Sequence, residues 1–270
     1  MPKIRLDVLL VERGLADSRA KAQALIMAGQ VRVNDQVALK PATGTDTKST
    51  LTVDSGPRFV SRGGEKLDGA LDAFAIDLKG FVCADVGSST GGFTDCMLKR
   101  GASKVYAIDV GKGILHWKLR NDRRVVVMEE TNARFVESLP EKIDFITVDA
   151  SFISLKVLLP AIKKWVSQNT QLICLIKPQF EAGKKDVSRG DGVIRSPEIH
   201  KQVLLDVLTY AKSEGFGLRG LVKSSLLGPK GNVEFLLWMD LKPNNGSVDE
   251  MVNRVMDEEV ASGGTISSSQ

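Results

Sequence analysis

Long apolar segments that alternate with amphipathic ones limit the fold of this chain more than any other feature. The segments 143–149 and 170–177 are apolar almost throughout, as in FITV and LICLI. Strands of this kind are covered on both faces, as in a parallel sheet with helices on either side. We expect strands at 80–86, 104–110, 124–128, 143–149, 170–177, 217–225 and 232–241, and helices at 64–75, 92–100, 114–120, 155–166 and 197–214. This order predicts a doubly wound α/β domain of about seven strands, the last two antiparallel.

Residues 1–56 have a different pattern, which predicts a small separate domain. Amphipathic segments at 4–14 and 18–29 indicate two short helices, and QVRVNDQVAL alternates around Asn34-Asp35 as in a β-hairpin. A turn-rich segment with one β-like piece, TLTVD, then leads to a boundary near Gly56-Pro57. We therefore expect an α+β domain (1–56), a linker (57–63), the α/β domain (64–242), and an acidic helix of one or two turns with a flexible tail (243–270).

The composition predicts a cytoplasmic protein without a metal. There is no N-terminal export signal, and no apolar run reaches the length of about 18 residues that a membrane span needs. The three cysteines, Cys83, Cys96 and Cys174, form no C-x-x-C motif, and with only two histidines they indicate neither a disulfide framework nor a zinc site. The net charge is +4, and because residues 241–270 carry −3, residues 1–240 carry +7. This basic part of the chain suggests a polyanionic partner.

A loop of small and hydroxylated residues follows the first strand of the α/β domain, in DVGSSTGGF (85–93). Ligands of open α/β sheets bind at the carboxyl ends of the strands, and the loop after the first strand is the usual place. A dinucleotide fingerprint would need glycine at Ser89, and a phosphate loop would need lysine at Phe93. Both phosphate-binding interpretations therefore lack their main contact. The loop either holds a ligand without phosphate or is only a tight connection.

S-adenosylmethionine (SAM) is such a ligand, since it carries an ammonium, a sulfonium and a ribose diol. Asp85 at the strand end would face the ammonium, directly or through water, while Gly87, Gly91 and Gly92 let the backbone close on the amino-acid end. Asp109 ends the next strand, 24 residues further on, near the separation at which an acid binds the ribose hydroxyls in related folds. Asn132, after the third strand, either contacts the adenine or belongs to a plain loop.

Two further strand ends carry ionisable residues where the reactive carbon of such a ligand would lie. Asp149 ends the strand at 143–149, and Lys177 ends the strand at 170–177. Amine methylases often have Pro-Pro-aromatic after the comparable acid, whereas Ala-Ser-Phe follows it here. A lysine suits a hydroxyl acceptor, because the attacking oxygen must lose its proton. Lys66 in SRGGEKL and Glu234 in GNVEFLL are candidates to tune that lysine, although such charges are more often solvated surface groups.

Motifs along most of the chain resemble a known family. RLDVLLVERGLADSRAKAQALIMAGQVRVN resembles the S4-like RNA-binding domain. SRGGEKL, DVGSSTGGFTD, DVGKGILHWKLRND, TVDASFISL, LIKPQFE and GNVEFL, in this order, resemble the TlyA family, whose catalytic domain is similar to FtsJ-like methyltransferases. The resemblance covers roughly residues 3–240.

The resemblance implies a Rossmann-like, SAM-dependent enzyme that methylates the 2′-hydroxyl of cytidines in 16S and 23S ribosomal RNA. It also implies a catalytic tetrad, matched here by Lys66, Asp149, Lys177 and Glu234. The SAM site would be lined by Asp109, Asp149 and the loop residues Gly87, Ser88, Ser89, Thr90, Gly91 and Phe93. Lys112, Ile114 and Glu130 depart from the usual family residues, which leaves contact details and target choice open.

Basic residues of the N-terminal domain predict contacts with RNA. Arg5, before the first helix, and Arg19 and Lys21, near the start of the second, are placed to bind phosphates, which position an RNA without reading its sequence. The domain lacks interleaved aromatic residues, so we expect it to recognise folded RNA. Loops near the catalytic face supply second candidates, namely Arg62, Arg134 and Lys184.

The expected function is 2′-O-methylation of ribosomal RNA by a cytoplasmic enzyme that uses SAM and no metal, binds ribosomal RNA or subunits, and is favoured to be a monomer. Two alternatives are a non-catalytic RNA-binding or assembly factor and a membrane-lytic hemolysin, the name first given to family members. The complete tetrad argues against the first. The lack of a spanning segment or an export signal argues against the second.

Overall fold

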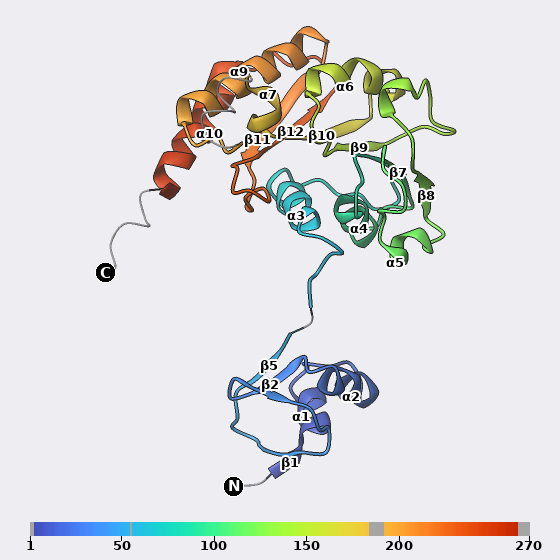
Figure 1. Cartoon of the computed structure of the whole chain (residues 1–270), viewed down its shortest axis with the longest axis vertical. Coiled ribbons are helices and arrows are strands. Elements are labelled where there is room, and N and C mark those ends of the chain that lie inside the picture. The colour runs from blue at the N-terminus through green and yellow to red at the C-terminus, as the bar shows by residue number, and fades with distance from the viewer. Residues whose placement is uncertain (1–2, 55, 184–191, 264–270) are drawn as a thin grey trace. The chain divides into compact units, whose positions relative to one another are not determined.

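The computed structural model describes residues 3–54, 56–183 and 192–263. The chain forms two compact units, Met1–Arg58 and Phe59–Gln270 (Figure 1). Each unit has its own hydrophobic core, so each is described by itself.

The first unit combines two helices with short strands. Its elements are β1 (Lys3–Arg5), α1 (Leu6–Glu12), α2 (Arg19–Met27), β2 (Val31–Val33), β3 (Gln36–Ala38), β4 (Gly44–Asp46) and β5 (Leu51–Val53). Asn34 and Asp35 turn between β2 and β3 with φ of 48° and 65°, which confirms the hairpin. The helix expected at 4–14 begins only at Leu6, because β1 pairs with β4, a strand that the turn-rich sequence did not indicate.

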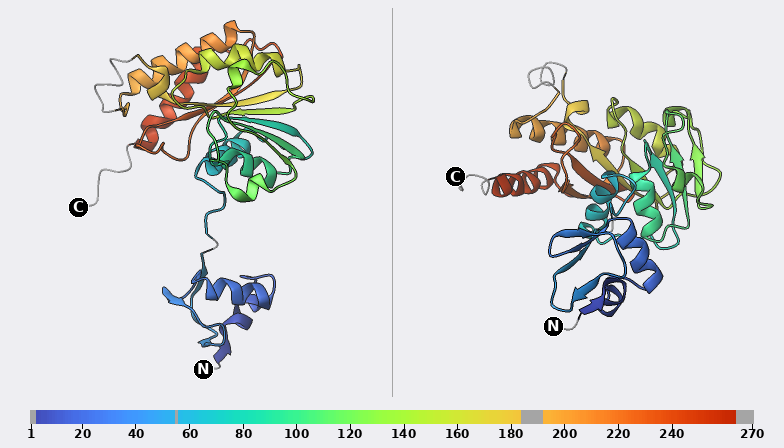
Figure 2. Two further views of the ribbon diagram at one scale, coloured as in Figure 1. Left: turned by 45° about the vertical axis from the view of Figure 1, so that its right-hand side comes forward. Right: turned by 60° about the horizontal axis from the view of Figure 1, so that its bottom comes forward.

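The second unit is built on a seven-stranded sheet in the order β11-β12-β10-β9-β6-β7-β8 (Figure 2). The strands from β10 to β8 in this order are parallel, and β12 pairs antiparallel with both β10 and β11. This confirms the predicted sheet. The strands are β6 (Val82–Val86), β7 (Lys104–Ile108), β8 (Val125–Met128), β9 (Phe145–Val148), β10 (Gln171–Ile176), β11 (Gly217–Lys223) and β12 (Phe235–Asp240).

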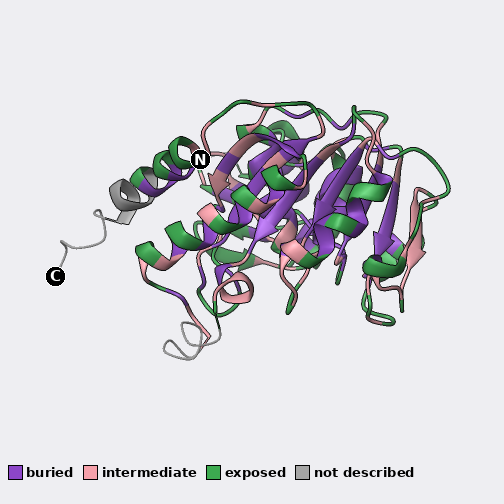
Figure 3. Cartoon of the chain, turned by 90° about the horizontal axis from the view of Figure 1, so that it is seen from above, coloured by how far each residue is buried: buried purple, intermediate pink, exposed green. Residues whose placement is uncertain are grey.

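Helices cover both faces of this sheet, so its strands are buried along most of their length (Figure 3). One face packs against α3 (Gly63–Ala73), α4 (Gly92–Lys99) and α5 (Trp117–Arg120). The other packs against α6 (Leu155–Ile162), α9 (Pro197–Ser213) and α10 (Val248–Gly263). Within the described residues, the remaining helical elements are η1 (Ala133–Phe135), η2 (Lys163–Trp165) and α7 (Pro178–Glu181).

Two segments differ from the sequence expectation because their apolar residues join the core. Phe59, within the expected linker, is 2% exposed and packs with the residues of α3 and α4. The acidic segment was expected to form one or two helical turns, but α10 is 16 residues long. Its Val252 and Val255 are buried in the cluster that includes α9. The tail at 264–270 lies outside the described residues.

Candidate active site

The glycine loop connects the end of β6 to the start of α4. Gly87 and Gly91 have φ of 83° and 94°, and Ser89 between them has φ of 48°. A Cβ at position 87 would lie 2.6 Å from the backbone oxygen of Asp149. Glycine is therefore required at 87 both for its backbone angle and for the close approach of the loop to the end of β9.

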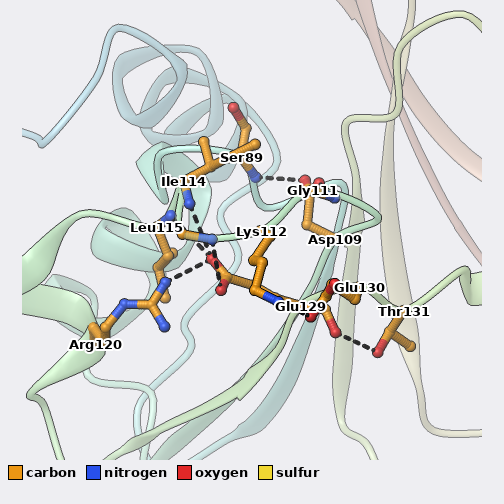
Figure 4. A network of polar contacts seen from close by, with 11 residues as sticks. Ser89, Asp109, Gly111, Lys112, Ile114, Leu115, Arg120, Glu129, Glu130 and Thr131 are labelled. Carbon is orange, nitrogen blue, oxygen red and sulfur yellow. Dashed lines mark hydrogen bonds and ion pairs between the residues drawn. The ribbon is translucent and has the colours of Figure 1, made fainter.

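Asp109 holds this loop against the neighbouring strand end. It follows β7, and its Oδ2 accepts a hydrogen bond from the Ser89 amide at 2.8 Å, while its Oδ1 accepts one from the Gly111 amide at 2.7 Å (Figure 4). A carboxylate can accept about four hydrogen bonds, so both oxygens keep acceptor capacity for a ligand. Asp109 is thus held in place and still able to bind a hydroxyl.

Glu129 is a residue of this region that the sequence did not indicate. Its carboxylate accepts hydrogen bonds from three consecutive backbone amides, 113–115, at 2.9, 3.1 and 3.3 Å, and from Arg120 Nη2 at 2.6 Å (Figure 4). The Gly113 amide, followed by the Arg120 guanidinium, lowers the pKa of Glu129 to about 2. Glu129 is therefore an anion, and its hydrogen bonds fix the segment after Asp109. In MEETN, the sequence pattern pointed only to residues after Glu129.

Asp85, predicted to face a ligand, is instead enclosed by the protein. It is fully buried in β6, where its Oδ2 accepts a hydrogen bond from Thr94 Oγ1 at 2.6 Å and its Oδ1 accepts one from Thr147 Oγ1 at 2.9 Å. Burial raises the pKa of Asp85 to about 7, and the two hydroxyl bonds oppose that rise. Threonines of α4 and β9 thus engage the carboxyl group beneath the loop.

A cavity of about 1020 Å³ lies beside the glycine loop. Residues of α3, the loop, the ends of β9 and β10, and the segment before β12 line it, including the four tetrad candidates Lys66, Asp149, Lys177 and Glu234. The loop contributes Gly87, Ser88, Ser89, Thr90 and Phe93. Among the residues predicted to bind SAM, those that do not line this cavity are Asp85, Gly91, Asp109 and Asn132.

The four tetrad candidates form two ion pairs inside this cavity. Lys66 Nζ lies 2.5 Å from Glu234 Oε2, across 168 positions of sequence, and both side chains are buried. Lys177 Nζ lies 2.6 Å from Asp149 Oδ1, and these side chains are 11% and 24% exposed. Lys177 also donates a hydrogen bond to Ser151 Oγ at 2.9 Å. Each cation therefore has an anionic partner, which is what allows four charges to be this secluded from water.

Asp149 links the two pairs electrostatically. Burial raises the pKa of Asp149, the cations Lys177 and Lys66 oppose the rise, and Glu234 adds to it. Apart from its ion pair, the buried Oδ1 of Asp149 accepts no hydrogen bond of good geometry from the described residues. Buried acceptors in folded proteins nearly always have a donor. The donor that faces this oxygen is the Lys177 ammonium, 2.6 Å away.

Two phenylalanines add an aromatic surface to the cavity. Phe152 is 90% exposed, has φ of 64°, and lies 4.9 Å from Phe180 between ring centroids. Lys177 Nζ lies 5.8 Å from the centroid of the Phe180 ring. A large residue in the left-handed region with an exposed ring is unusual and points to a contact outside the chain. In the sequence, Phe152 is the Phe of DASF, which indicated only that the chain lacks the Pro-Pro-aromatic motif of amine methylases.

The segment after β8 uses its polar residues locally. Asn132 Oδ1 accepts a hydrogen bond from the Arg134 amide at 3.1 Å and so caps η1. Lys112 and Glu130, two of the residues that depart from the family pattern, form an exposed ion pair at 2.9 Å. The two residues therefore compensate each other in charge at the surface. Exposed pairs of this kind contribute little to stability.

The predicted RNA-binding residues have different surroundings. Arg5 and Arg19 both bond to Asp7, and Lys21 is exposed on α2. Arg62 lines the cavity and donates a hydrogen bond to the backbone oxygen of Leu227 at 3.1 Å. The Arg134 guanidinium lies 5.5 Å from the centroid of the exposed Phe135 ring. Lys184 lies outside the described residues.

Known proteins are similar to this chain in both sequence and fold. The FtsJ-like methyltransferase family matches residues 59–241, and the S4 domain matches residues 4–44. The 16S/23S rRNA (cytidine-2′-O)-methyltransferase TlyA of Mycobacterium tuberculosis is 45% identical over 264 residues, 95% of this chain and 98% of that protein. Hemolysin A of Brachyspira hyodysenteriae is 41% identical over 236 residues, 86% of this chain and 98% of that protein.

A solved structure described as a hemolysin from Streptococcus thermophilus has a TM-score of 0.70 and 40% identity, and it covers 98% of this chain and 99% of that one. In the described part of the chain, no helix is both long and apolar enough to cross a membrane. The match of the catalytic unit and the close full-length relatives lead to one conclusion. The chain belongs to the FtsJ-like methyltransferase family, and it carries an S4 domain ahead of the methyltransferase domain.

Proposed function

We propose that the chain transfers a methyl group from SAM to the 2′-hydroxyl of cytidine in ribosomal RNA. The name of the Mycobacterium tuberculosis relative supports this substrate. The observation that carries the chemistry is the pair of secluded ion pairs, Lys66–Glu234 and Lys177–Asp149, in one cavity beside the glycine loop.

The loop and its neighbours suit the binding of SAM. The close approach at Gly87 leaves no room for a side chain, and residues 87–90 line the cavity beside the tetrad. Asp109 would accept hydrogen bonds from the ribose hydroxyls, with Glu129 holding the adjacent segment. A cavity of about 1020 Å³ has room for the cofactor and part of a second molecule.

The Lys177–Asp149 pair would receive the proton of the ribose hydroxyl. SAM, when bound, supplies the methyl group: the ribose oxygen bonds to its carbon as the carbon–sulfur bond breaks and sulfur keeps the electron pair. Cationic Lys177 stabilises negative charge that develops on the oxygen. The proton passes to the pair, because burial raises the pKa of Asp149 and lets its carboxylate share a proton with the lysine. Lys66 and Glu234 are themselves an ion pair, so they add no net charge beside the Lys177–Asp149 pair.

Other features serve the recognition of RNA. Phe152, beside Phe180, would stack on the base of the target nucleotide. Stacking of a base on an exposed aromatic ring contributes about 1–3 kcal/mol to the free energy of binding. Arg62 at the cavity would bind a phosphate near the target. The S4 domain would bind ribosomal RNA through Arg5, Arg19 and Lys21. An enzyme with this substrate would act in the cytoplasm.

Methyl transfer to separated ribosomal subunits tests the proposal. Wild-type protein is incubated with methyl-labelled SAM and with 30S or 50S subunits that lack the modification, and labelled nucleosides are identified after digestion. We expect label on the 2′-oxygen of cytidine. Lys177→Ala should abolish transfer while SAM affinity, measured by calorimetry, stays within about twofold, because Lys177 acts on the acceptor oxygen.

The matched control is Lys142→Ala, an exposed lysine before the start of β9, at the opposite end of that strand from Asp149. It should transfer methyl groups as the wild type does. Absence of label on both subunits would contradict the proposed substrate. Equal label with Lys177→Ala and wild type would contradict the proposed role of the tetrad.

A further inference from the structure

A buried carboxylate in the first unit gathers two arginines. Asp7 lies in the first turn of α1 and is fully buried among residues of the core. Arg5 donates two hydrogen bonds to it, from Nε at 3.0 Å and Nη2 at 2.9 Å. Arg19 donates from Nε at 3.0 Å, and Gln23 donates from its amide at 2.8 Å. An ionised carboxylate is costly to bury, and these four donors from two segments offset that cost.

The arginines that hold this carboxylate still face water. The side chains of Arg5 and Arg19 are 45% and 56% exposed, whereas that of Asp7 is 0% exposed. Arg5 Nη2 and Arg19 Nε contact the same oxygen, Asp7 Oδ2, so the two guanidinium groups lie side by side. Arg19 is anchored through Nε, and among the described residues no hydrogen bond or ion pair engages its two terminal nitrogens. Its outward end is free to form the two-pronged contact that guanidinium groups make with phosphate.

We propose that Asp7 is a positioning residue for RNA binding, which holds Arg5 and Arg19 as a preformed pair of guanidinium groups that clamps the phosphate backbone. The inference rests on the proposed RNA-binding role of this unit and names the residue that prepares it. A free arginine side chain loses rotational freedom when it binds a phosphate. Asp7 imposes that order before the RNA arrives, and its negative charge offsets the repulsion between the two cations.

Charge alone predicts the opposite effect of removing Asp7. Replacement of a carboxylate beside two arginines by a neutral amide makes the surface more positive, and a more positive surface binds RNA more tightly. Loss of the clamp predicts weaker binding, because the amide of an asparagine would turn an N–H₂ group towards donors and release the arginines. The direction of the change in RNA affinity therefore distinguishes positioning from net charge.

The test uses the full chain with undermethylated 30S and 50S subunits as the probe. We expect Asp7→Asn to raise the dissociation constant for the subunit that the wild type binds by about tenfold, the cost of ordering two side chains. The KM for that subunit should rise in parallel, with kcat at saturation unchanged. Asp17→Asn is the matched control, since Asp17 is an exposed acid of the same unit. It should leave RNA affinity unchanged or slightly tighter.

A second variant keeps the result interpretable if Asp7→Asn unfolds the unit, which hydrogen exchange at residues 3–53 would reveal. Arg19→Lys preserves both the net charge and a partner for Asp7, but a lysine that pairs with Asp7 has no second pair of donors for phosphate. We expect about fivefold weaker subunit binding with this variant, and no change with the control Arg32→Lys at an exposed arginine.

The outcomes separate the positioning role from the proposed function. Wild-type protein that binds neither subunit would contradict the RNA-binding role itself. Wild-type binding with equal or tighter binding by folded Asp7→Asn would overturn the positioning role alone. If that variant is unfolded, equal binding by Arg19→Lys and wild type would overturn it.

Discussion

Replacement of Asp85 by asparagine should change the pH dependence of stability. The carboxyl group is fully buried and bonded to Thr94 and Thr147, and its pKa is raised from 3.8 to about 7, chiefly by burial. Between these two values the folded chain binds a proton that the unfolded chain has released. Stability must therefore fall as pH rises from about 4 to about 7. Asparagine has a similar shape and does not titrate; its Oδ1 can accept a hydrogen bond from one threonine hydroxyl, and its N–H₂ group can donate one to the other.

The expected size of this effect follows from the shift in pKa. A shift of about three units corresponds to about 4 kcal/mol, at about 1.4 kcal/mol per unit. Asp85→Asn and wild type should therefore be similarly stable near pH 4, where both side chains are neutral. Near pH 8 the variant should gain up to about 4 kcal/mol relative to wild type. Because the comparison is between two chains that differ at one residue, the titration of groups that do not interact with Asp85 cancels.

Guanidinium unfolding of both proteins at a series of pH values, followed by tryptophan fluorescence, measures the difference. Asp77→Asn, which makes the same substitution at an exposed carboxylate, is the control. A constant difference between Asp85→Asn and wild type across this range would refute the account of a buried, protonated carboxyl. Loss of SAM binding by the folded variant would support the predicted direct contact between Asp85 and SAM, which the burial of Asp85 argues against.

Two further substitutions test the support of the cofactor site. Glu129→Gln should weaken SAM binding by about tenfold, with kcat at saturating SAM nearly unchanged, because a neutral amide cannot hold three backbone amides and Arg120 together. Calorimetry measures the SAM affinity and steady-state kinetics measure kcat. An unchanged SAM affinity would contradict the role of Glu129 in positioning residues 113–115. Gly87→Ala should abolish SAM binding and destabilise the fold by about 1–3 kcal/mol, because its Cβ would meet the Asp149 backbone at 2.6 Å. Gly80→Ala is its control in thermal unfolding and calorimetry, with φ of 80° and no atom within 4 Å of the added Cβ; equal SAM affinity for these two variants would refute the close-approach argument.

Most of the sheet could be predicted because its signal is local. A strand covered on both faces must be apolar along its own length, as 145–148 and 171–176 are, whatever its neighbours do. The elements that were missed or shortened depend on partners elsewhere. β4 exists because it pairs with β1, and α10 extends because α9 offers it an apolar surface.

The candidate site divides in the same way. The residue types at the strand ends indicated a ligand site, and the loop has serine at 89 and phenylalanine at 93, where phosphate-binding motifs need glycine and lysine. Together these features were enough to indicate a ligand without phosphate. Resemblance, not spacing, selected Lys66 and Glu234 for the tetrad. Only the structure places them 2.5 Å apart across 168 positions. No pattern in the sequence indicated the left-handed backbone and exposed ring of Phe152, or the hydrogen bonds that Glu129 accepts from residues 113–115.

Asp85 shows where sequence reasoning ends. The sequence by itself determined that a carboxylate ends the first strand of the sheet, that glycines follow it, and that helices alternate with buried strands, because each of these is a property of neighbouring residues. Only the tertiary structure decided that Thr94 and Thr147 engage this carboxylate from α4 and β9, so that it lies beneath the loop. Which of its possible partners a side chain meets depends on how distant segments pack, and the local sequence carries no record of that.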